Sequence, residues 1–231
     1  MSDPIPPTPV AAGSRSGRPP WIVPAILIAI IVVIAVLFVT SSLRRPELAE
    51  FGPSPALAGE AGEGLVGPLT YTIDATDGAA WRHFDFSSGS RVEPADPLGW
   101  DIAFRRFHVI ANGGERFPGK AGVLDLGEVG FDSVLAAPAT GYIETRSARD
   151  TLNPAIDRWY TYSWISHILK TSDHVYAVRT ADGRYAKMRI LSYYCPGAVP
   201  GCMTFEYVYQ GSGSRSFVPE PNPVAGDPDP R

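Results

Sequence analysis

The chain has 231 residues and a mass of 24.9 kDa, with a formal net charge of −4 and a pI near 5.6. No run of Lys or Arg interrupts this acidic balance, so the chain lacks a basic surface for nucleic-acid phosphates. Composition therefore argues against nucleic-acid binding. The length fits one ordinary domain once the compositionally biased ends are set aside.

Residues 1–20 are rich in Pro, Ser and Gly without a hydrophobic period, which predicts a disordered cytoplasmic tail. Residues 21–40, WIVPAILIAIIVVIAVLFVT, contain no charge. A helix of about 20 residues rising about 1.5 Å per residue crosses a hydrocarbon core about 30 Å thick. We therefore predict a transmembrane helix over 21–40, with Pro24 in its first turn and Trp21 at headgroup depth.

Two alternatives for this segment stay open. A buried core helix would rarely run this long without a polar face. A cleaved signal peptide is the stronger rival, because Val39-Thr40-Ser41 passes as a weak cleavage site. Secretory apolar regions usually span about 7 to 15 residues, so the length favours a retained anchor.

Topology depends on weaker signals. Two arginines flank the span on each side, Arg15 and Arg18 before it and Arg44 and Arg45 after it. The flanking positive charge therefore does not indicate which end is cytoplasmic. Cys195 and Cys202 enclose PGAVPG, a spacing that suits a disulfide in an oxidising compartment, with two free thiols as the alternative. We predict a single-pass protein of the cytoplasmic membrane, N-terminus inside, whose C-terminal domain is periplasmic or extracellular.

The rest of the chain divides by composition. Residues 41–68 carry Gly, Ala, Pro and Glu without periodicity and predict a flexible linker that lets the domain stand off the bilayer by roughly some tens of ångströms. Residues 69–210 hold the strand-forming segments, and 211–231 return to a disorder-prone composition. The fold class predicted is all-β, an antiparallel sheet domain built of hairpins and preceded by one transmembrane helix.

Several strands can be assigned from the pattern. Residues 69–76 and 81–94 predict two strands, with turn chemistry at Asp77-Gly78 and Ser88-Gly89 around the second. Residues 100–110, WDIAFRRFHVI, predict one long strand on whose inner face Arg106 is the exception, ending in the reversal Asn112-Gly113-Gly114. Residues 159–169, WYTYSWISHIL, predict an aromatic strand.

Residues 174–210 give the clearest hairpin pattern. Asp182-Gly183 predicts a two-residue type I′ turn that pairs Ala181 with Arg184. That register places one apolar set on the core face: Val175, Ala177, Ala186, Met188 and Ile190. The opposite, wetter face would carry Tyr176, Val178, Tyr185, Lys187 and Arg189. Pairing Cys195 with Cys202 sets Ile190 opposite Tyr207 and keeps the apolar face in register, which independently favours the disulfide.

Three of these segments, taken together, resemble the HmuY-like family: WDIAFRRFHVIANGG (100–114), GKAGVLDLG (119–127) and YAVRTADGRYAKMRILSYY (176–194). The resemblance covers roughly residues 69–210. It implies an antiparallel all-β fold on the outer side of the membrane. In the best-known members, which are lipid-anchored, it also implies haem capture through two axial side chains.

The chain departs from that pattern in two respects. No lipobox cysteine follows the hydrophobic run, so the anchor would be a helix in place of a lipid. The ligand histidines of haem-binding members do not align with numbered positions here. The resemblance therefore supports the fold more strongly than the ligand.

Haem iron accepts imidazole or thioether ligands, and the candidate donors are His83, His108, His167, His174, Met188 and Met203. His108 and His174 are the first pair to test, for haem and as metal ligands, and His167 is third. The alternative for each is an ordinary packed or surface histidine. The two methionines are better explained as core residues, and Trp159, Tyr160, Tyr162 and Trp164 as a ligand wall or as sheet packing.

Signals of enzymatic activity are weak. The chain contains no GxSxG, HExxH, CxxC or phosphate-loop pattern. Asp101, His108 and a serine could be drawn as a triad, but residue types without geometry carry no weight. Asp125 and Glu128 are too few for a calcium loop. We predict a protein without catalytic activity.

Two functions follow. The first is a membrane-anchored extracytoplasmic binding protein that holds haem or a related tetrapyrrole. The second is a non-catalytic accessory or docking subunit of an envelope protein complex, which the permanent helix would suit.

Overall fold

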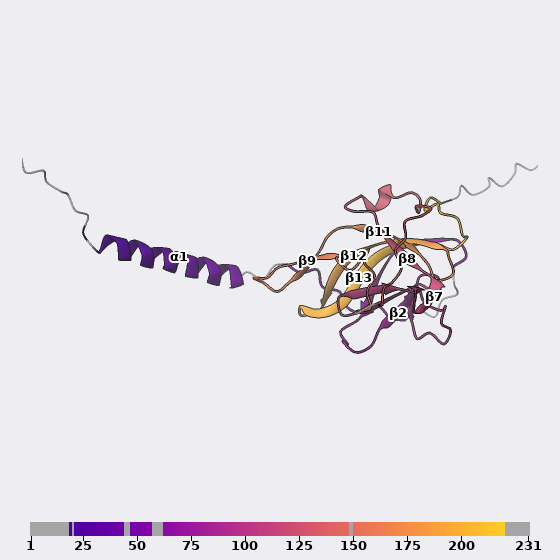
Figure 1. The fold of residues 1–231 in the computed structure, drawn as a ribbon, viewed down its shortest axis with the longest axis horizontal. Coiled ribbons are helices and arrows are strands. Elements are labelled where there is room, and N and C mark those ends of the chain that lie inside the picture. The colour runs from indigo at the N-terminus through magenta and orange to yellow at the C-terminus, as the bar shows by residue number, and fades with distance from the viewer. Residues whose placement is uncertain (1–18, 20, 44–46, 57–61, 148–149, 220–231) are drawn as a thin grey trace, which may run out of the picture. The chain divides into compact units, whose positions relative to one another are not determined.

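The computed structural model describes residues 19, 21–43, 47–56, 62–147 and 150–219. The chain divides into two compact units, Met1–Pro46 and Glu47–Arg231 (Figure 1). The tail predicted over 1–20 falls outside the described residues except for Pro19, as does the end of the predicted C-terminal tail from 220 on.

The described residues of the first unit form helix α1 (Ile22–Leu43), which confirms the predicted apolar helix. By length and composition α1 can cross a membrane. Its large apolar side chains are exposed all around the helix, from Val23 to Val39. A buried core helix would instead place these side chains against neighbouring elements.

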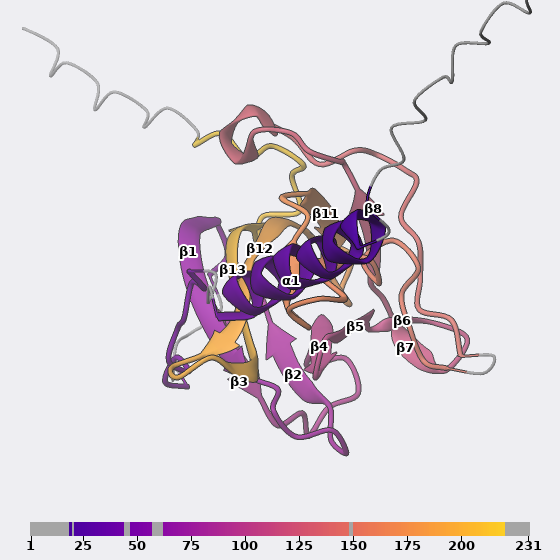
Figure 2. The ribbon, with the colours of Figure 1, turned by 90° about the vertical axis from the view of Figure 1, so that its left-hand side faces the viewer.

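The second unit is all-β, as predicted, and its strand ladders are antiparallel. The larger sheet has five strands in the order β1 (Leu65–Asp74), β13 (Val199–Gln210), β12 (Tyr185–Cys195), β11 (Val175–Arg179) and β8 (Gly122–Asp125) (Figure 2). A four-stranded sheet has the order β3 (Ser90–Val92), β2 (Arg82–Asp85), β4 (Ile102–Arg105) and β5 (His108–Ala111). Two short ribbons pair β6 (Gly113–Gly114) with β7 (Phe117–Lys120) and β9 (Tyr160–Tyr162) with β10 (Leu169–Thr171), and η1 (Phe131–Ser133) is a 3₁₀ turn.

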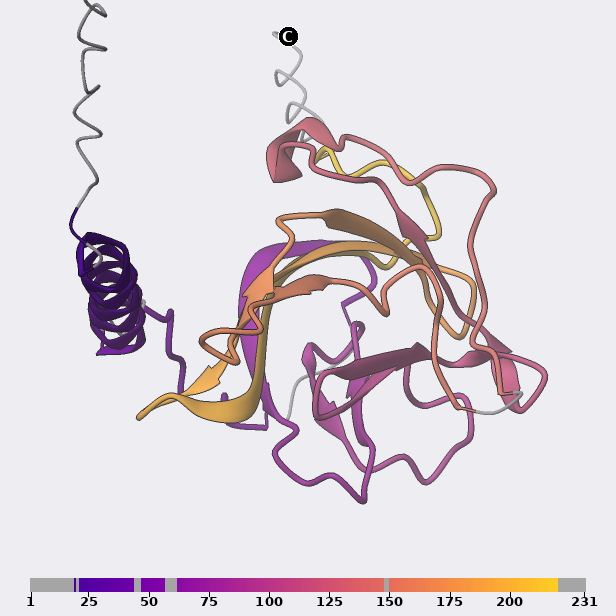
Figure 3. The same ribbon diagram turned by 60° about the vertical axis from the view of Figure 1, so that its left-hand side comes forward.

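The two larger sheets form layers joined by an aromatic core (Figure 3). Phe84 of β2 meets Phe205 of β13 edge to face with ring centroids 5.0 Å apart, and Phe104 of β4 stacks on the same ring at 5.2 Å. Tyr207 packs against Phe84 at 5.5 Å. Edge-to-face and offset pairs of this kind stabilise a core beyond the area they bury.

A second, smaller core lies on the other face of the five-stranded sheet. Phe131 of η1, Val175 of β11, Val208 of β13 and Phe217 pack together there. In Figure 3 the segment with η1 and the yellow C-terminal segment lie above this sheet, while β2, β4 and β5 lie below it. Both faces of the sheet are therefore covered, which explains why its inner strands β11, β12 and β13 are mostly buried.

Lys187 of β12 is buried in this second core, although the predicted hairpin register placed it on the wetter face. Its Nζ donates to the carbonyl oxygens of Phe131 at 2.8 Å and Val134 at 3.0 Å. The ammonium also lies 4.5 Å from the centre of the Phe131 ring and 5.6 Å from that of Phe217. Burial lowers the pKa of Lys187, and the carbonyls and ring faces replace the water that the charge has lost.

The β11–β12 hairpin is present, but its predicted register is wrong by one residue. Val178 pairs with Ala186 and Arg179 with Tyr185, so the turn contains three residues instead of two. Asp182 fixes this turn by accepting from the Thr180 hydroxyl and the Arg184 amide, and Gly183 supplies the left-handed φ of +90°.

A shift of one residue moves the side chains of one strand to the opposite face. Tyr176 and Val178 therefore join Ala186, Met188 and Ile190 in the main core, whereas Val175 enters the second core. The predicted core face was right for β12 and wrong for β11.

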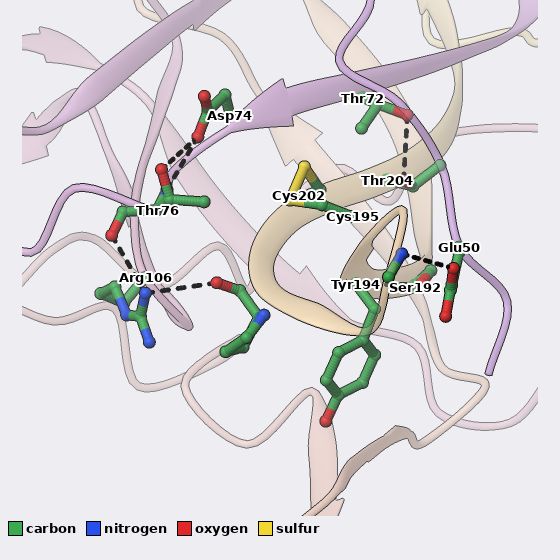
Figure 4. Close-up of a disulfide and its surroundings, with 12 residues drawn as sticks. Glu50, Thr72, Asp74, Thr76, Arg106, Ser192, Tyr194, Cys195, Cys202 and Thr204 are labelled. Atoms are coloured by element: carbon green, nitrogen blue, oxygen red, sulfur yellow. Dashed lines mark hydrogen bonds between the residues drawn. A yellow bond between two sulfur atoms is a disulfide. The ribbon is translucent and has the colours of Figure 1, made fainter. Parts of the chain in front are cut away.

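The disulfide between Cys195 and Cys202 is confirmed, with Cα atoms 4.9 Å apart (Figure 4). Its strand register differs from the prediction, because Ile190 lies opposite Phe205 instead of Tyr207 and Cys195 opposite Val199. The difference at Ile190 is two residues, an even number, so the predicted core face of β12 and β13 is kept.

The single strand predicted over 100–110 is wrong, because the chain reverses at Arg106 and Phe107 to form the β4–β5 hairpin. Arg106 has a φ of 54°, and its guanidinium donates to the carbonyl oxygens of Thr76 and Pro200 (Figure 4). Arg106, the charged residue that interrupted the apolar pattern, therefore lies in the turn between the two strands. The aromatic strand predicted over 159–169 is likewise a hairpin, β9–β10.

Part of the predicted linker contacts the domain. Leu48 packs against the main core, Glu50 forms a parallel bridge with Tyr194 of β12, and the Phe51 amide donates to the Tyr194 carbonyl oxygen at 3.0 Å. Phe217, in the predicted tail, is buried, and its amide donates to the Leu135 carbonyl oxygen. The packed unit thus extends beyond 69–210 at both ends.

Asp101 connects the two layers through its side chain. One carboxylate oxygen accepts from the Phe86 amide at 2.9 Å and the other from the Ala181 amide at 2.8 Å. Phe86 follows β2 of the four-stranded sheet, and Ala181 lies in the β11–β12 turn. Burial, aided by the nearby charge of Asp85, raises the pKa of Asp101 to about 8, since an ionised carboxylate loses its hydration there.

Replacing Gly113 by Ala tests the close approach of β6 to the chain around Ala121. A Cβ at Gly113 would lie 1.9 Å from the Ala121 carbonyl oxygen, and the neighbouring backbone cannot swing away as a side chain would. We expect Gly113→Ala to lower the free energy of unfolding by about 2 kcal/mol or more, measured by urea titration in mild detergent. The control is Gly64→Ala, which meets no atom within 4 Å and should change stability by less than about 0.5 kcal/mol. Equal effects of the two changes would contradict the packing described.

Replacing Asp101 by Asn tests the buried carboxylate. Only one oxygen remains, so one backbone amide loses its acceptor, and we expect a loss of about 1–3 kcal/mol at pH 5. The folded pKa of about 8 lies above an unfolded value of about 3.9. Protonation of Asp101 therefore contributes fully to the free energy of unfolding below about pH 4. This contribution is lost as pH rises through about 8.

The stability difference between the parent chain and Asp101→Asn should accordingly shrink from pH 5 to pH 8. Urea titrations at several pH values measure it. A difference that stays constant, or grows, over this range would show that Asp101 is ionised in the fold throughout.

Candidate functional site

His108 begins β5, an edge strand of the four-stranded sheet. Its side chain is 37% exposed, and its Nδ1 lies 3.9 Å from a carboxylate oxygen of Asp157. The ring centroid is 4.2 Å from that of Phe107, the turn residue before it. The backbone of Asp157 is fixed by its amide, which donates to the carbonyl oxygen of the buried Asn153. His108 thus presents an imidazole at the surface between an aromatic ring and an acid.

The aromatic residues beside His108 form a continuous cluster. Trp159 is almost fully buried, and its Nε1 donates to the Phe107 carbonyl oxygen at 2.8 Å. Tyr160 meets Phe107 edge to face at 5.7 Å, and Tyr193 of β12 lies 5.8 Å from Trp159. This aromatic cluster (Phe107, Trp159, Tyr160 and Tyr193) joins the β4–β5 turn to the β9–β10 hairpin and to the five-stranded sheet.

His174 immediately precedes β11, and its side chain is 28% exposed. Its Nδ1 lies 2.9 Å from both carboxylate oxygens of Asp125, the last residue of β8. The segment before His174 is held by Ser172, whose amide and hydroxyl both donate to the Trp159 carbonyl oxygen. Trp159 therefore supports both candidate residues, through its indole on the side of His108 and through its backbone on the side of His174.

The two histidines are alike in which nitrogen faces an acid, although only His174 hydrogen-bonds its carboxylate; His108 lies 3.9 Å from that of Asp157, beyond hydrogen-bond distance. In each, the nitrogen that faces a carboxylate is Nδ1, which leaves Nε2 as the nitrogen that can bind a metal. A histidine that ligates a metal usually directs its other ring nitrogen to a carboxylate, a carbonyl or water, which fixes the ring and raises its basicity. No direct contact joins His108 to His174 among the described residues.

The other two histidines have different surroundings. His167 lies in the turn of the β9–β10 hairpin with a φ of 56°, and its Nδ1 hydrogen-bonds the Tyr162 hydroxyl. His83 of β2 packs edge-on against Trp100 with centroids 4.7 Å apart, and burial lowers the pKa of His83. The structure therefore separates His83 and His167 from the carboxylate-backed pair.

Tyr193 contributes an unpaired polar atom to the aromatic cluster. Its residue is 3% exposed, and its hydroxyl has no hydrogen-bond partner among the described residues. Burial raises the pKa of Tyr193, so the hydroxyl keeps its proton. An orphaned buried hydroxyl costs about 1–3 kcal/mol, and such a group calls for an explanation such as a ligand or a water.

Two cavities in the described part of the chain contain no histidine. The larger, about 420 Å³, lies along residues 142–147 with Gly114 and Glu115, and the smaller, about 130 Å³, is bordered by Asp85, Asp101 and Asp182. Within the same residues, no group of three or more His, Cys, Asp or Glu is arranged to hold a metal ion.

The triad that residue types allowed does not form, because both oxygens of Asp101 accept backbone amides instead of facing His108. Sequence reasoning missed the acids that do face the candidates, Asp157 and Asp125. Asp125 could have been found from its position at the end of a strand beside that of His174. Asp157, in a polar loop, gave no local signal.

Tyr193→Phe removes the orphaned hydroxyl and leaves the ring. We expect the ligand-free protein to become more stable by up to about 1 kcal/mol, because a buried unpaired group is replaced by an apolar one. Tyr194→Phe is the matched control on the same strand, since the Tyr194 hydroxyl accepts the Leu169 amide at 2.8 Å. That change should destabilise the protein by about 1–3 kcal/mol. Urea titration of both variants measures the contrast, and a loss of stability in Tyr193→Phe would mean that its hydroxyl is paired.

Solved structures share this fold. An apo HmuY analog from Tannerella forsythia superposes with a TM-score of 0.54 at 19% identity, covering 63% of this chain and 96% of that one. Apo PinO from Porphyromonas gingivitis gives a TM-score of 0.51 at 16% identity, with 62% and 97% covered. A protein from Bacteroides vulgatus described as HmuY-like and haem-binding gives 0.50 at 25% identity, with 71% and 98% covered.

No curated protein matches the sequence significantly. The family model described as HmuY protein matches residues 77–207, more than half of the chain. This match contains the three segments 100–114, 119–127 and 176–194, both carboxylate-backed histidines and the disulfide. The chain is a member of the HmuY family.

Proposed function

We propose that this protein is a membrane-anchored, extracytoplasmic haem-binding protein without catalytic activity, and that His108 and His174 are its first candidate iron ligands. The observation that carries the proposal is the carboxylate facing Nδ1 of each ring, Asp157 at 3.9 Å and Asp125 at 2.9 Å. Family membership supports it, because one similar structure is described as haem-binding.

The residues beside His108 suit a flat, apolar ligand with an iron centre. Both imidazoles are partly exposed. Phe107 and Tyr160 present ring surface beside His108, and the Tyr193 hydroxyl is an unpaired donor in the same aromatic cluster. Haem would supply the iron that accepts imidazole nitrogen. The chain's own residues would bind it, orient the His174 ring through Asp125, and exclude water with the aromatic cluster.

In this proposal α1 is the membrane anchor. Its apolar side chains are exposed on all sides, and the helix is long enough to cross a bilayer. The Cys195–Cys202 disulfide supports an oxidising compartment for the domain, since disulfides persist there. We therefore place the N-terminus in the cytoplasm and the β domain on the outer side of the cytoplasmic membrane. His167, in the hairpin turn, is the third candidate ligand.

Titration of the full chain in mild detergent with hemin tests the proposal. We expect a Soret shift that saturates at one haem per chain. His108→Ala and His174→Ala should each weaken binding by about tenfold or more, and Asp125→Asn by about 10- to 100-fold through loss of the acid that orients His174. His167→Ala tests the third candidate.

The control is His83→Gln, which changes a histidine that packs edge-on against Trp100. It should leave the Soret titration unchanged. Absence of any Soret shift in the parent chain would remove haem and leave the accessory or docking role. A shift that survives in the His108→Ala, His174→Ala double variant would assign the iron ligands elsewhere.

A further inference from the structure

The tip of the β9–β10 hairpin exposes large apolar side chains in a fixed turn. Trp164 is 75% exposed, Tyr162 54% and Ile165 45%, and Trp164 has the highest exposure of any large hydrophobic residue that the structure describes. The turn is held by its own hydrogen bonds: the His167 amide donates to the Ser163 carbonyl oxygen at 2.8 Å and the Ser163 amide to that of Ile168 at 2.9 Å. The chain therefore holds three apolar side chains in water, where they would gain by entering an apolar phase.

The hairpin lies at the end of the domain where the chain enters it. Tyr194 of β12 accepts the Leu169 amide of β10 through its hydroxyl at 2.8 Å. The backbone of the same Tyr194 bridges Glu50 and accepts the Phe51 amide at 3.0 Å. Figure 4 shows Tyr194 and Glu50 together beside the disulfide. One residue thus connects the exposed hairpin to the first residues of the domain.

Few residues separate those first contacts from the helix. Helix α1 ends at Leu43, and Leu48 already packs against the main core. Five peptide units span at most about 18 Å when fully extended. If α1 crosses a bilayer, the membrane surface from which it emerges therefore lies within about that distance of Leu48. This bound is much shorter than the stand-off expected from a linker over 41–68.

We propose that the β9–β10 hairpin tip is a membrane contact, in which Trp164 and Ile165 enter the interfacial region of the bilayer that α1 spans. This rests on the proposed membrane anchor. Trp and Tyr favour the headgroup region because each combines an apolar ring with a polar atom. The tip carries no acidic residue between Tyr162 and His167, so no carboxylate opposes its entry. The contact orients the domain on the membrane.

The test measures quenching of Trp164 fluorescence by brominated lipid. The full chain carrying Trp21→Phe, which removes the tryptophan of the anchor segment, is reconstituted at low protein-to-lipid ratio into phosphatidylcholine–phosphatidylglycerol vesicles with bromine near the headgroups. Of the tryptophans that remain besides Trp164, Trp100 and Trp159 are buried in the domain and Trp81 is half-buried beneath the Arg105 guanidinium. We expect brominated lipid to quench part of the emission, and the further change Trp164→Phe to abolish that quenchable part.

The matched control moves the tryptophan to the other end of the domain. Leu98 is an exposed apolar residue that borders the same small cavity as Asp182, at the turn that precedes β12, whereas Tyr194 lies near the end of that strand. Leu98→Trp in the Trp21→Phe, Trp164→Phe chain should show no quenching by brominated lipid. Equal quenching at both positions would overturn the proposal, because the domain would then have no preferred face toward the bilayer.

Two further outcomes separate this inference from the proposed anchor. A chain that fails to float with the vesicles, or that alkaline carbonate extracts, contradicts the anchor itself. A chain that floats and resists carbonate but whose Trp164 is not quenched contradicts only the hairpin contact. A blue-shifted Trp164 emission without bromine quenching would also overturn it, since the tip would then be covered by protein.

Discussion

A single buried carboxylate joins the two layers of the domain. Asp101 accepts one backbone amide from the segment after β2 and another from the β11–β12 turn. The Asn112 amide donates to the Asp101 carbonyl oxygen, and the Ala121 amide donates in turn to the Asn112 carbonyl oxygen. Four segments that are distant in sequence therefore meet at one point, and each pairs a backbone group that would otherwise be buried without a partner.

This network also explains what the family resemblance recognises. The segments 100–114, 119–127 and 176–194 contribute Asp101 and Asn112, Ala121, and Ala181 respectively. A Cβ at Gly119 would lie 2.2 Å from the Asn112 carbonyl oxygen, so the second segment needs glycine to approach the first. These residues hold the sheets together through backbone hydrogen bonds and close packing, which is why they identify the fold more securely than the ligand.

Much of the architecture could be predicted from local pattern. The apolar helix, the all-β class, the β11–β12 hairpin and the disulfide all follow from composition, period and turn residues. The single strand predicted over 81–94 is wrong, because this segment forms the β2–β3 hairpin. The register of β11 could not be predicted, because the sequence around Asp182 and Gly183 is compatible with a two-residue turn and with the three-residue turn that the structure contains. Arg106 was seen as an exception to the pattern, but its turn is fixed by carbonyl groups of Thr76 and Pro200, which are far away in sequence.

The candidate site was less predictable than the fold for the same reason. His108 and His174 could be named as donors, yet their acids lie 49 residues away in each case, Asp157 after His108 and Asp125 before His174. Trp159 contacts the segments next to both histidines: its indole donates to Phe107, beside His108, and its carbonyl oxygen accepts from Ser172, near His174. Hydrophobic periodicity predicts which residues of one strand lie on the same face, and it does not predict pairs that are distant in sequence.

The burial of Lys187 has a consequence for how the chain can be shortened. Its ammonium is covered by Phe131 and Phe217, and Phe217 is held in place by backbone bonds between the 215–217 segment and residues 135–137. Trimming the chain at Gln210 would remove half of that cover and admit water to a cation in the second core. A recombinant fragment should therefore retain Val218, and an affinity tag belongs beyond it.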